Sequence, residues 1–431
     1  MSFRSVMHSV LASGTTAALG MVSGLAVARG LGPSMRGELA AVVGWTGTIA
    51  SVLDLGLGFA AGYFAGKEPR RAPVLLSQIL TVAAGLGVIC YFLAAVVVLP
   101  HLALKEMPRG VQLWLLLGIP ISMAAGYVAQ ISMGLGHISA SNGTRLVASA
   151  FYAATTVGLV FWGYRELAGY AFANLGTQAI LLVLGLAWLL RSGRLSLMWP
   201  GRSGLANVLR YGLRTQLASL AAQLNLRLDQ LVMSIVLPSE ALGQYVVAVA
   251  LAAMPMPLFS GIAVAATPRI IAATDTKQGA LRGLRFLALG VAFAGLTSIF
   301  LISIAEPIIT LLFGAEYHRA VAAGRILLGA SVFQGCNLLL GTVLRGIGRP
   351  AGPAVGELSG TIVTVSLLPV LIPRYGILGA AGTSLAAYFI ATVVLLVLLI
   401  AGAKLSLRAV FADWFGTLFA VVARRRRTNL R

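Results

Sequence analysis

Charge is scarce in this sequence, and acidic charge is the scarcest. Only 10% of the 431 residues are charged, with 12 Asp and Glu against 32 Lys and Arg. Soluble domains carry about 25% charged residues, so the composition excludes the soluble and the disordered classes. Hydrophobic residues make up 58% of the chain and recur in long runs. The sequence therefore predicts helices that span a membrane, each of which needs about 20 apolar residues.

Cysteine and histidine are also rare, with two and four residues respectively. Cys90 and Cys336 both lie inside apolar runs, which does not support a disulfide framework. The histidines are scattered and show no metal-ligand spacing, so no metal site is expected. No segment matches the glycine-rich phosphate loop of nucleotide-binding proteins. We therefore expect no cofactor, and any transport must draw on an ion gradient, the membrane potential, consumption of the product or a separate partner.

The apolar runs predict about twelve transmembrane helices and an all-α polytopic membrane protein. The connections are short, often marked by Pro, Gly or charge, and too short for a separate soluble domain. We predict two six-helix bundles around a central cavity, residues 1–195 and 196–400, and an interfacial helix with a basic tail over residues 401–431. The predicted spans are 8–29, 38–65, 73–100, 111–134, 143–163, 167–190, 206–237, 241–268, 284–304, 322–344, 354–372 and 376–400.

Lys and Arg are distributed unevenly between the two sets of connections. Segments on the side of the N-terminus hold 23 of them and segments on the other side hold 8, while Arg227 alone lies within a span. Because basic residues gather in cytoplasmic loops, both termini should be cytoplasmic. The excess of positive charge then reflects topology, and no nucleic-acid partner is expected.

The tail combines helically spaced apolar residues with a run of four arginines, residues 424–427. This pattern predicts an interfacial helix whose basic patch contacts anionic lipids. A disordered basic tail after a short apolar helix is the alternative.

Two segments about half the chain apart resemble each other. Leu31–Glu38 follows the first predicted span, and Leu237–Gln244 follows the seventh. Their prolines, Pro33 and Pro238, are 205 residues apart. Together with the even number of spans, this similarity favours two parallel repeats with a pathway at their interface.

The seventh predicted span is the most polar one. Read as one continuous helix, its polar residues follow spacings of three and four and would form a single stripe. Because such a stripe cannot face lipid, it must face a water-filled cavity or another helix. The members of this stripe are Gln216, Ser219, Gln223, Arg227, Gln230 and Ser234.

Arg227 is the candidate for the main substrate-binding residue. It should lie near the middle of the membrane, where an ionisable group costs roughly 2.5–3.5 kcal/mol on insertion scales and so needs a reason. A guanidinium binds phosphate through two parallel hydrogen bonds, which suggests an anion-attracting role in a cavity. The alternative is a buried ion pair with Asp229 or Asp54. Asp229, which shares a face with Asn225, is expected either to hold this helix to a neighbour or to serve in coupling.

Other ionisable residues are candidates for binding or coupling. Asp54 lies in the second span, where it can be a coupling carboxylate or a helix–helix hydrogen-bonding group beside a glycine-rich kink. Arg29 near the external end of the first span, and Arg210 and Arg214 near the cytoplasmic entrance of the seventh, would attract a diphosphate. Interfacial snorkelling explains such arginines equally well.

Seven short motifs, in order along nearly the whole chain, resemble one family. The family is the polysaccharide-type transporters of the multidrug/oligosaccharidyl-lipid/polysaccharide flippase superfamily, which includes bacterial O-antigen-type flippases. Each motif is short and loose, and it is their joint order that is moderately specific. The motifs are Ala28–Pro33 with Gly37, Asp54–Leu57, Leu228–Leu231, Leu242–Tyr245, Pro268 with Arg269, Leu312–Tyr317 and Leu344–Pro350.

The resemblance implies a cavity that opens alternately to each side and a lipid-diphosphate substrate received by cavity arginines. The function expected is non-enzymatic movement of undecaprenyl-diphosphate-linked oligosaccharide across the cytoplasmic membrane. Its expected partners are the lipid-linked glycan, membrane lipids, and the glycan polymerase and glycosyltransferases of the same pathway. The alternatives are a cation-coupled small-molecule antiporter and a membrane glycan polymerase or ligase, and the short external loops argue against the enzyme.

Overall fold

The computed structural model describes residues 3–191 and 205–406, and within them nearly every residue is helical. The contacts within the chain group its residues into two compact units, Met1–Gly243 and Gln244–Arg431. The predicted division at residues 195 and 196 stays a prediction. The predicted interfacial helix and arginine run of the tail lie outside the described residues.

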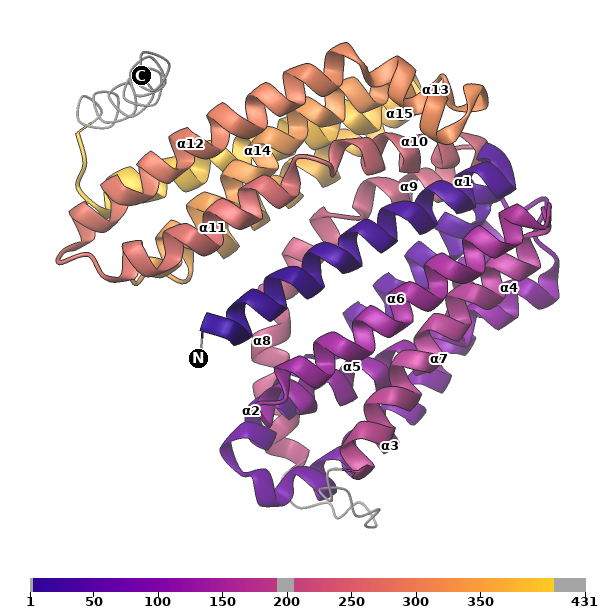
Figure 1. Cartoon of the computed structure of the whole chain (residues 1–431), viewed down its shortest axis with the longest axis horizontal. Coiled ribbons are helices and arrows are strands. Elements are labelled where there is room, and N and C mark those ends of the chain that lie inside the picture. Colours follow the sequence, from indigo (N-terminus) through magenta and orange to yellow (C-terminus); the bar gives the residue numbers. More distant parts are fainter. Residues whose placement is uncertain (1–2, 192–204, 407–431) are drawn as a thin grey trace. The chain divides into compact units, whose positions relative to one another are not determined.

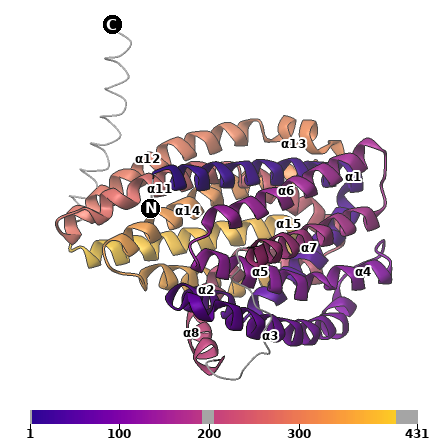
Figure 2. The same cartoon turned by 60° about the horizontal axis from the view of Figure 1, so that its bottom comes forward.

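The first unit begins with α1 (Phe3–Leu53), whose helix changes direction at Gly32. Gly32 has φ 71° and ψ 175°, a conformation open to glycine, and Pro33 follows it as the first residue of the next span. The second span continues into α2 with a bend of 52°. In both views α6 runs beside α1 (Figures 1 and 2). The remaining helices of this unit are α2 (Leu57–Lys67), α3 (Ala72–Leu93), α4 (Arg109–Leu116), α5 (Gly118–Gly134), α6 (Ile138–Phe161), α7 (Leu167–Arg191), α8 (Leu205–Asn225) and α9 (Leu228–Val236).

Short helical turns join some of these elements. A 3-10 turn covers Pro69–Arg71 before α3, and a π-helical stretch, Ala94–Val98, and a further 3-10 turn, Leu99–His101, extend it. The glycines of α2 allow α5 to approach closely: a Cβ on Gly62 would lie 2.7 Å from the carbonyl oxygen of Gln130, and one on Gly66 would lie 2.8 Å from that of Gly134. The close packing permitted by these glycines is thus present.

The second unit is a bundle in which α14 packs against both α12 and α15 (Figure 1). Its core joins large apolar side chains from α11, α12, α14 and α15, among them Phe259, Leu284, Leu339 and Leu395. Its elements are α10 (Ser239–Ala252, which begins in the first unit), α11 (Met256–Ile271), α12 (Thr276–Ser303), α13 (Ala305–Phe313), a 3-10 turn (Ala315–Tyr317), α14 (Ala320–Gly346) and α15 (Gly352–Gly402).

The described helices include several of membrane-spanning length. Seven helices are long and apolar enough to cross a membrane, and two bent pairs, α1 with α2 and α10 with α11, bring the number to nine. The 51-residue helix α15 consists of two helices that meet at Gly376, as the two parts of α1 meet at Gly32. The described part of the chain is almost entirely helical, and the prediction of an all-α polytopic membrane protein is confirmed.

The two similar segments of the sequence make similar contacts. The carboxylate of Glu38 accepts hydrogen bonds from the backbone N–H groups of Lys105, Glu106 and Met107, in the connection before α4. Gln244, 206 residues later in the sequence, holds the connection before α14: its amide donates to the Glu316 carbonyl and accepts from the N–H of Ala320. The last residue of each similar segment thus holds a later connection of the chain through its side chain.

Glycines bring the two similar segments together. A Cβ on Gly37 would lie 1.7 Å from the carbonyl oxygen of Ser239, and one on Gly243 would lie 1.9 Å from that of Pro33. The hydroxyl oxygens of Ser34 and Ser239 are 3.4 Å apart. Only glycine allows this approach, which explains why both segments carry one at this place.

Candidate functional site

The seventh span is broken where the sequence predicted one continuous helix. α8 ends at Asn225 and α9 begins at Leu228, and Arg227, with φ −132° and ψ −11°, precedes α9. Asn and Asp side chains offer the backbone hydrogen bonds that compete with a helix, and Asp229 accepts one from the N–H of Gln230 at 2.7 Å. The single stripe with unbroken helical spacing was therefore wrong across residues 226 and 227.

The polar residues of α8 and α9 nevertheless face another helix, the second part of α1. The amide of Gln216 donates to the Ser51 carbonyl, and the Ser51 hydroxyl donates to the side-chain oxygen of Gln223. On α9, Ser234 accepts a hydrogen bond of 2.9 Å from the indole nitrogen of Trp45. Of the two surroundings expected for this stripe, a neighbouring helix is thus present at both of its ends.

Arg227 lies between these two contacts, beside a glycine of α1. A Cβ on Gly47 would be 2.9 Å from a terminal nitrogen of the guanidinium, so this place suits glycine and Arg227 lies directly over it. The arginine is exposed. The structure shows no ion pair of Arg227 with Asp229 or Asp54, which was the alternative expected from the sequence.

Asp54 occupies the break of the second span. Leu55 and Gly56 both have positive φ, 53° and 69°, which confirms the predicted kink. The hydroxyl of Tyr127 donates to the Asp54 carbonyl oxygen at 3.4 Å, and that oxygen also accepts from the N–H of Leu57 at 3.0 Å. The break crosses α8, because a Cβ on Gly56 would lie 2.1 Å from the carbonyl oxygen of Gly212. Whether Asp54 couples transport to an ion stays a prediction.

The remaining predicted site residues are dispersed along the first unit. Arg210 is exposed on α8, next to Tyr211, whose ring stacks on Tyr63 with centroids 4.6 Å apart. Arg29 is exposed on the first part of α1. Asn225 and Asp229 are buried on either side of the break, and Gln230 is half-buried. The side chains of Arg214 and Ser219 lie outside the described residues.

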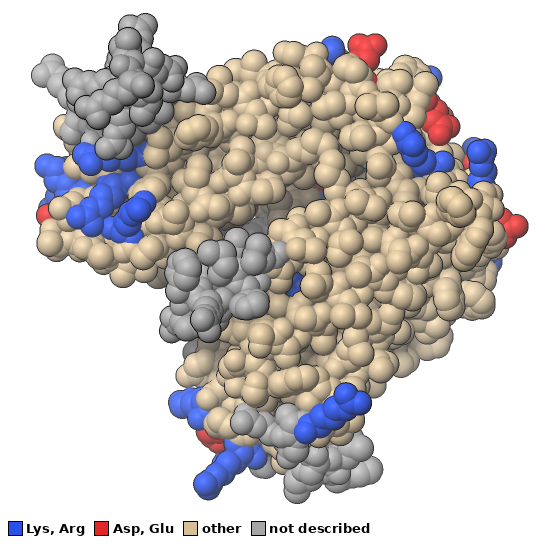
Figure 3. Space-filling view, viewed as in Figure 1, with Lys and Arg blue, Asp and Glu red and all other residues tan. Residues whose placement is uncertain are grey.

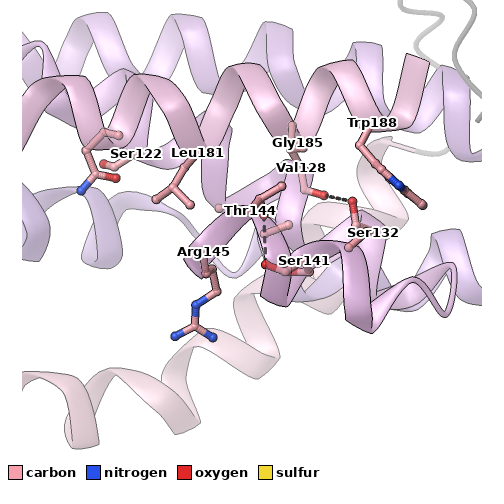
Figure 4. Close-up of a pocket in the computed structure, with 14 residues that line it drawn as sticks. Ser122, Val128, Ser132, Ser141, Thr144, Arg145, Leu181, Gly185 and Trp188 are labelled. Atoms are coloured by element: carbon pink, nitrogen blue, oxygen red, sulfur yellow. Dashed lines mark hydrogen bonds between the residues drawn. The ribbon is translucent and has the colours of Figure 1, made fainter. Parts of the chain in front are cut away.

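Sequence reasoning missed a second polar place, a cavity of about 230 Å³ between α5, α6 and α7 (Figure 4). Arg145 of α6 and Trp188 of α7 are among the residues that line it, together with Gln178. The hydroxyls of Ser132 and Thr144 donate to backbone carbonyls one turn earlier, which leaves their oxygens to accept hydrogen bonds. A cavity with one guanidinium, an indole and several hydroxyls suits a polar ligand, but these residues have no sequence spacing that marks them.

Comparison with known proteins assigns the chain to a family. Residues 2–273 match the family model described as "Polysaccharide biosynthesis protein". No curated protein sequence matches the chain.

Solved structures resemble it in fold. A lipid II flippase, MurJ, in an inward closed conformation has a TM-score of 0.75 at 15% identity, over 97% of this chain and 92% of that one. A multidrug resistance MATE transporter in its inward-facing conformation has a TM-score of 0.64 at 16% identity, over 96% of each chain. Its outward-facing form has a TM-score of 0.63 at 16% identity, over 92% and 94%.

Proposed function

Since this chain belongs to the polysaccharide biosynthesis protein family, we propose that it is a flippase for lipid-linked oligosaccharide. It moves an undecaprenyl-diphosphate-linked oligosaccharide across the cytoplasmic membrane by alternating access and catalyses no bond change. The lipid-linked glycan is the substrate, and the glycosyltransferases that build it and the polymerase that extends it are the pathway partners. The family shows the broader part of this proposal, a membrane protein of polysaccharide biosynthesis, and the site supports the substrate.

The observation that carries the proposal is Arg227 at the break between α8 and α9. Its guanidinium is exposed within a membrane-spanning segment, beside Gly47, and no described residue forms an ion pair with it. A cation at this depth is costly unless an anion or water meets it. A diphosphate offers several oxygens to the planar donor fork of arginine.

The break itself supports a binding role. Non-helical backbone within a membrane is tolerated where it is buried in protein or faces a water-filled cavity. At Arg227 the chain also presents the N-terminal end of α9, whose partial positive charge favours an anion. The guanidinium and the helix end therefore act in the same direction on a substrate phosphate.

The amide side chains of Gln216 and Gln223 have a supporting role in this proposal. Both side chains form hydrogen bonds with Ser51. They therefore fix α8 against α1 and keep Arg227 over Gly47. Arg210, Arg214 and Arg29 serve as a basic path along which the head group enters and leaves. The orientation that this requires has both termini in the cytoplasm, as the uneven Lys and Arg distribution predicts.

A cation-coupled antiporter of small molecules is the second candidate, and Asp54 favours it. A carboxylate at a broken membrane helix, next to the Tyr127 hydroxyl, is a group that could exchange a proton or bind a cation. On this alternative, replacement of Asp54 by Asn would abolish drug efflux, and replacement of Arg227 would not.

The test is complementation of a bacterium that lacks its oligosaccharide flippase, with Arg227→Ala and Arg227→Lys variants. We expect the alanine variant to lose at least about 90% of surface glycan at normal abundance of folded protein, and the lysine variant to retain part, because an ammonium keeps the charge but loses the fork. Arg374→Ala is the matched control, since Arg374 is an exposed arginine of the second unit. Normal surface glycan in a stable Arg227→Ala strain would refute the assignment.

A further inference from the structure

Three arginines surround one pocket at the turn between α11 and α12, in the second unit. Arg269 comes from the last turn of α11, and Arg282 and Arg285 come from the second and third turns of α12. The pocket measures about 290 Å³, and Phe286 and Leu289 complete its wall. Blue side chains gather at this end of the unit, at the left of the space-filling view (Figure 3). The pocket therefore offers concentrated positive charge beside an apolar wall.

Contacts within the pocket hold two of the arginines in place. A terminal nitrogen of Arg282 donates to the carbonyl oxygen of Arg269 at 2.9 Å. The guanidinium carbon of Arg269 lies 5.5 Å from the centroid of the Phe286 ring, a cation–π distance. The acidic residue in this turn, Asp275, instead caps α12 by accepting the N–H of Gln278 at 2.6 Å. The three arginines that line the pocket bring like charges to one space, which favours an anion there.

An apolar stripe continues from the pocket along the same face of α12. After Phe286 and Leu289, the residues at spacings of three and four are Phe293, Leu296 and Phe300, which are 53%, 66% and 62% exposed. In a membrane protein, large exposed apolar side chains along a span contact acyl chains. The three arginines thus lie at one end of an apolar stripe of α12 that faces the lipid.

We propose that this pocket, which we call the Arg269 pocket (Arg269, Arg282, Arg285, Phe286 and Leu289), binds an anionic phospholipid. The phosphate lies among the three guanidinium groups, and the acyl chains follow α12. A diphosphatidylglycerol, with two phosphates, matches three cations better than a phospholipid with one phosphate. Basic pockets between membrane helices commonly hold such head groups. Arg227, the proposed substrate residue, lies in the other unit, so this lipid site does not depend on the proposed transport function.

The experiment is native mass spectrometry of the purified, delipidated full-length protein titrated with defined lipids. We expect diphosphatidylglycerol to bind tighter than phosphatidylglycerol, and phosphatidylglycerol at least about tenfold tighter than phosphatidylcholine. An Arg269→Gln, Arg282→Gln, Arg285→Gln variant should lose that preference. The matched control replaces three exposed basic residues elsewhere, Arg70, Arg165 and Arg374, by Gln, and should keep it.

A single variant and two competing ligands are added to this experiment. Should the triple variant fail to fold, Arg285→Gln alone, an exposed position outside the cation–π contact, should weaken diphosphatidylglycerol binding about fivefold. Inorganic diphosphate and undecaprenyl diphosphate are added as competitors. Full displacement by inorganic diphosphate would show an aqueous anion site, and preferential displacement by undecaprenyl diphosphate would show a substrate site. Either result, or an unchanged lipid preference in the variants, would overturn the proposal.

Discussion

Two polar regions of the first unit use arginine in opposite ways. In the segment Pro33–Glu38, Arg36 is 6% exposed and donates to the Gly24 carbonyl at 2.7 Å, and Glu38 is fully buried. In the α8–α9 segment, Arg227 is exposed and lies over a glycine. Two residues of the same type thus differ in burial and in partners, which predicts a structural role for Arg36 and favours the proposed binding role of Arg227.

The energetic consequence is that stability and transport should depend on different residues. Removal of a buried side chain leaves its partners without hydrogen bonds, at about 1–3 kcal/mol for each orphaned group. Removal of an exposed side chain leaves no buried partner behind. Mutations in the Pro33–Glu38 segment should therefore unfold the protein, and mutations at Arg227 should abolish function in a folded protein.

The largest effect is expected for Glu38→Ala. Three backbone N–H groups would lose their acceptor, the buried one of Met107 and the partly buried ones of Lys105 and Glu106. We expect a loss of about 3 kcal/mol or more, and little folded protein after size-exclusion chromatography. Glu38→Gln is the control, because its amide oxygen can still accept and the loss should be smaller. Wild-type thermal stability of the alanine variant would show that this carboxylate is not a structural support.

A smaller effect is expected for Gly37→Ala. Its Cβ would lie 1.7 Å from the Ser239 carbonyl oxygen, so the two segments must separate. We expect a loss of about 1–3 kcal/mol, typical of overpacking, measured by thermal unfolding in detergent. Gly261→Ala is the matched control, since a Cβ there meets nothing within 4 Å. Equal melting temperatures for the two variants would contradict close contact at Gly37.

The smallest effect is expected for Glu68→Gln. Its ion pair with Arg71, at 3.0 Å, is on the surface, with side chains 45% and 78% exposed. Such pairs contribute about 0–1 kcal/mol, so the melting temperature should shift by no more than that of a neutral surface substitution. A decrease in melting temperature as large as that of Gly37→Ala would contradict the claim that buried contacts contribute more to stability than exposed ones.

Much of the fold could be predicted from the sequence, because apolar runs and breakers follow local rules. The spans, the kink after Asp54 and the close packing of Gly62 were readable in this way. The break at Arg227 was not, since helical periodicity cannot register an interruption of two residues. Buried Glu38 was missed as well, because a charge beside a span end usually lies at the interface. Its similarity in position to Gln244 was the available signal.

The candidate site could be predicted only in part. Arg227 and Gln223 stood out because polar residues are rare within spans, whereas Arg145 lies near a span end and its cavity is built from three helices. The contacts around Arg227 join residues that are distant in the sequence, such as Gly47 with Arg227 and Trp45 with Ser234. No local pattern encodes such pairs.

The most direct test of Arg227 as the diphosphate-binding residue is an equilibrium binding measurement on purified wild-type and Arg227→Ala proteins. The ligands are undecaprenyl diphosphate and undecaprenol, which share the lipid chain and differ in the phosphates. We expect the variant to keep the wild-type melting temperature, to bind undecaprenyl diphosphate at least about tenfold more weakly, and to bind undecaprenol equally well. Equal affinity of both proteins for undecaprenyl diphosphate would contradict the assignment.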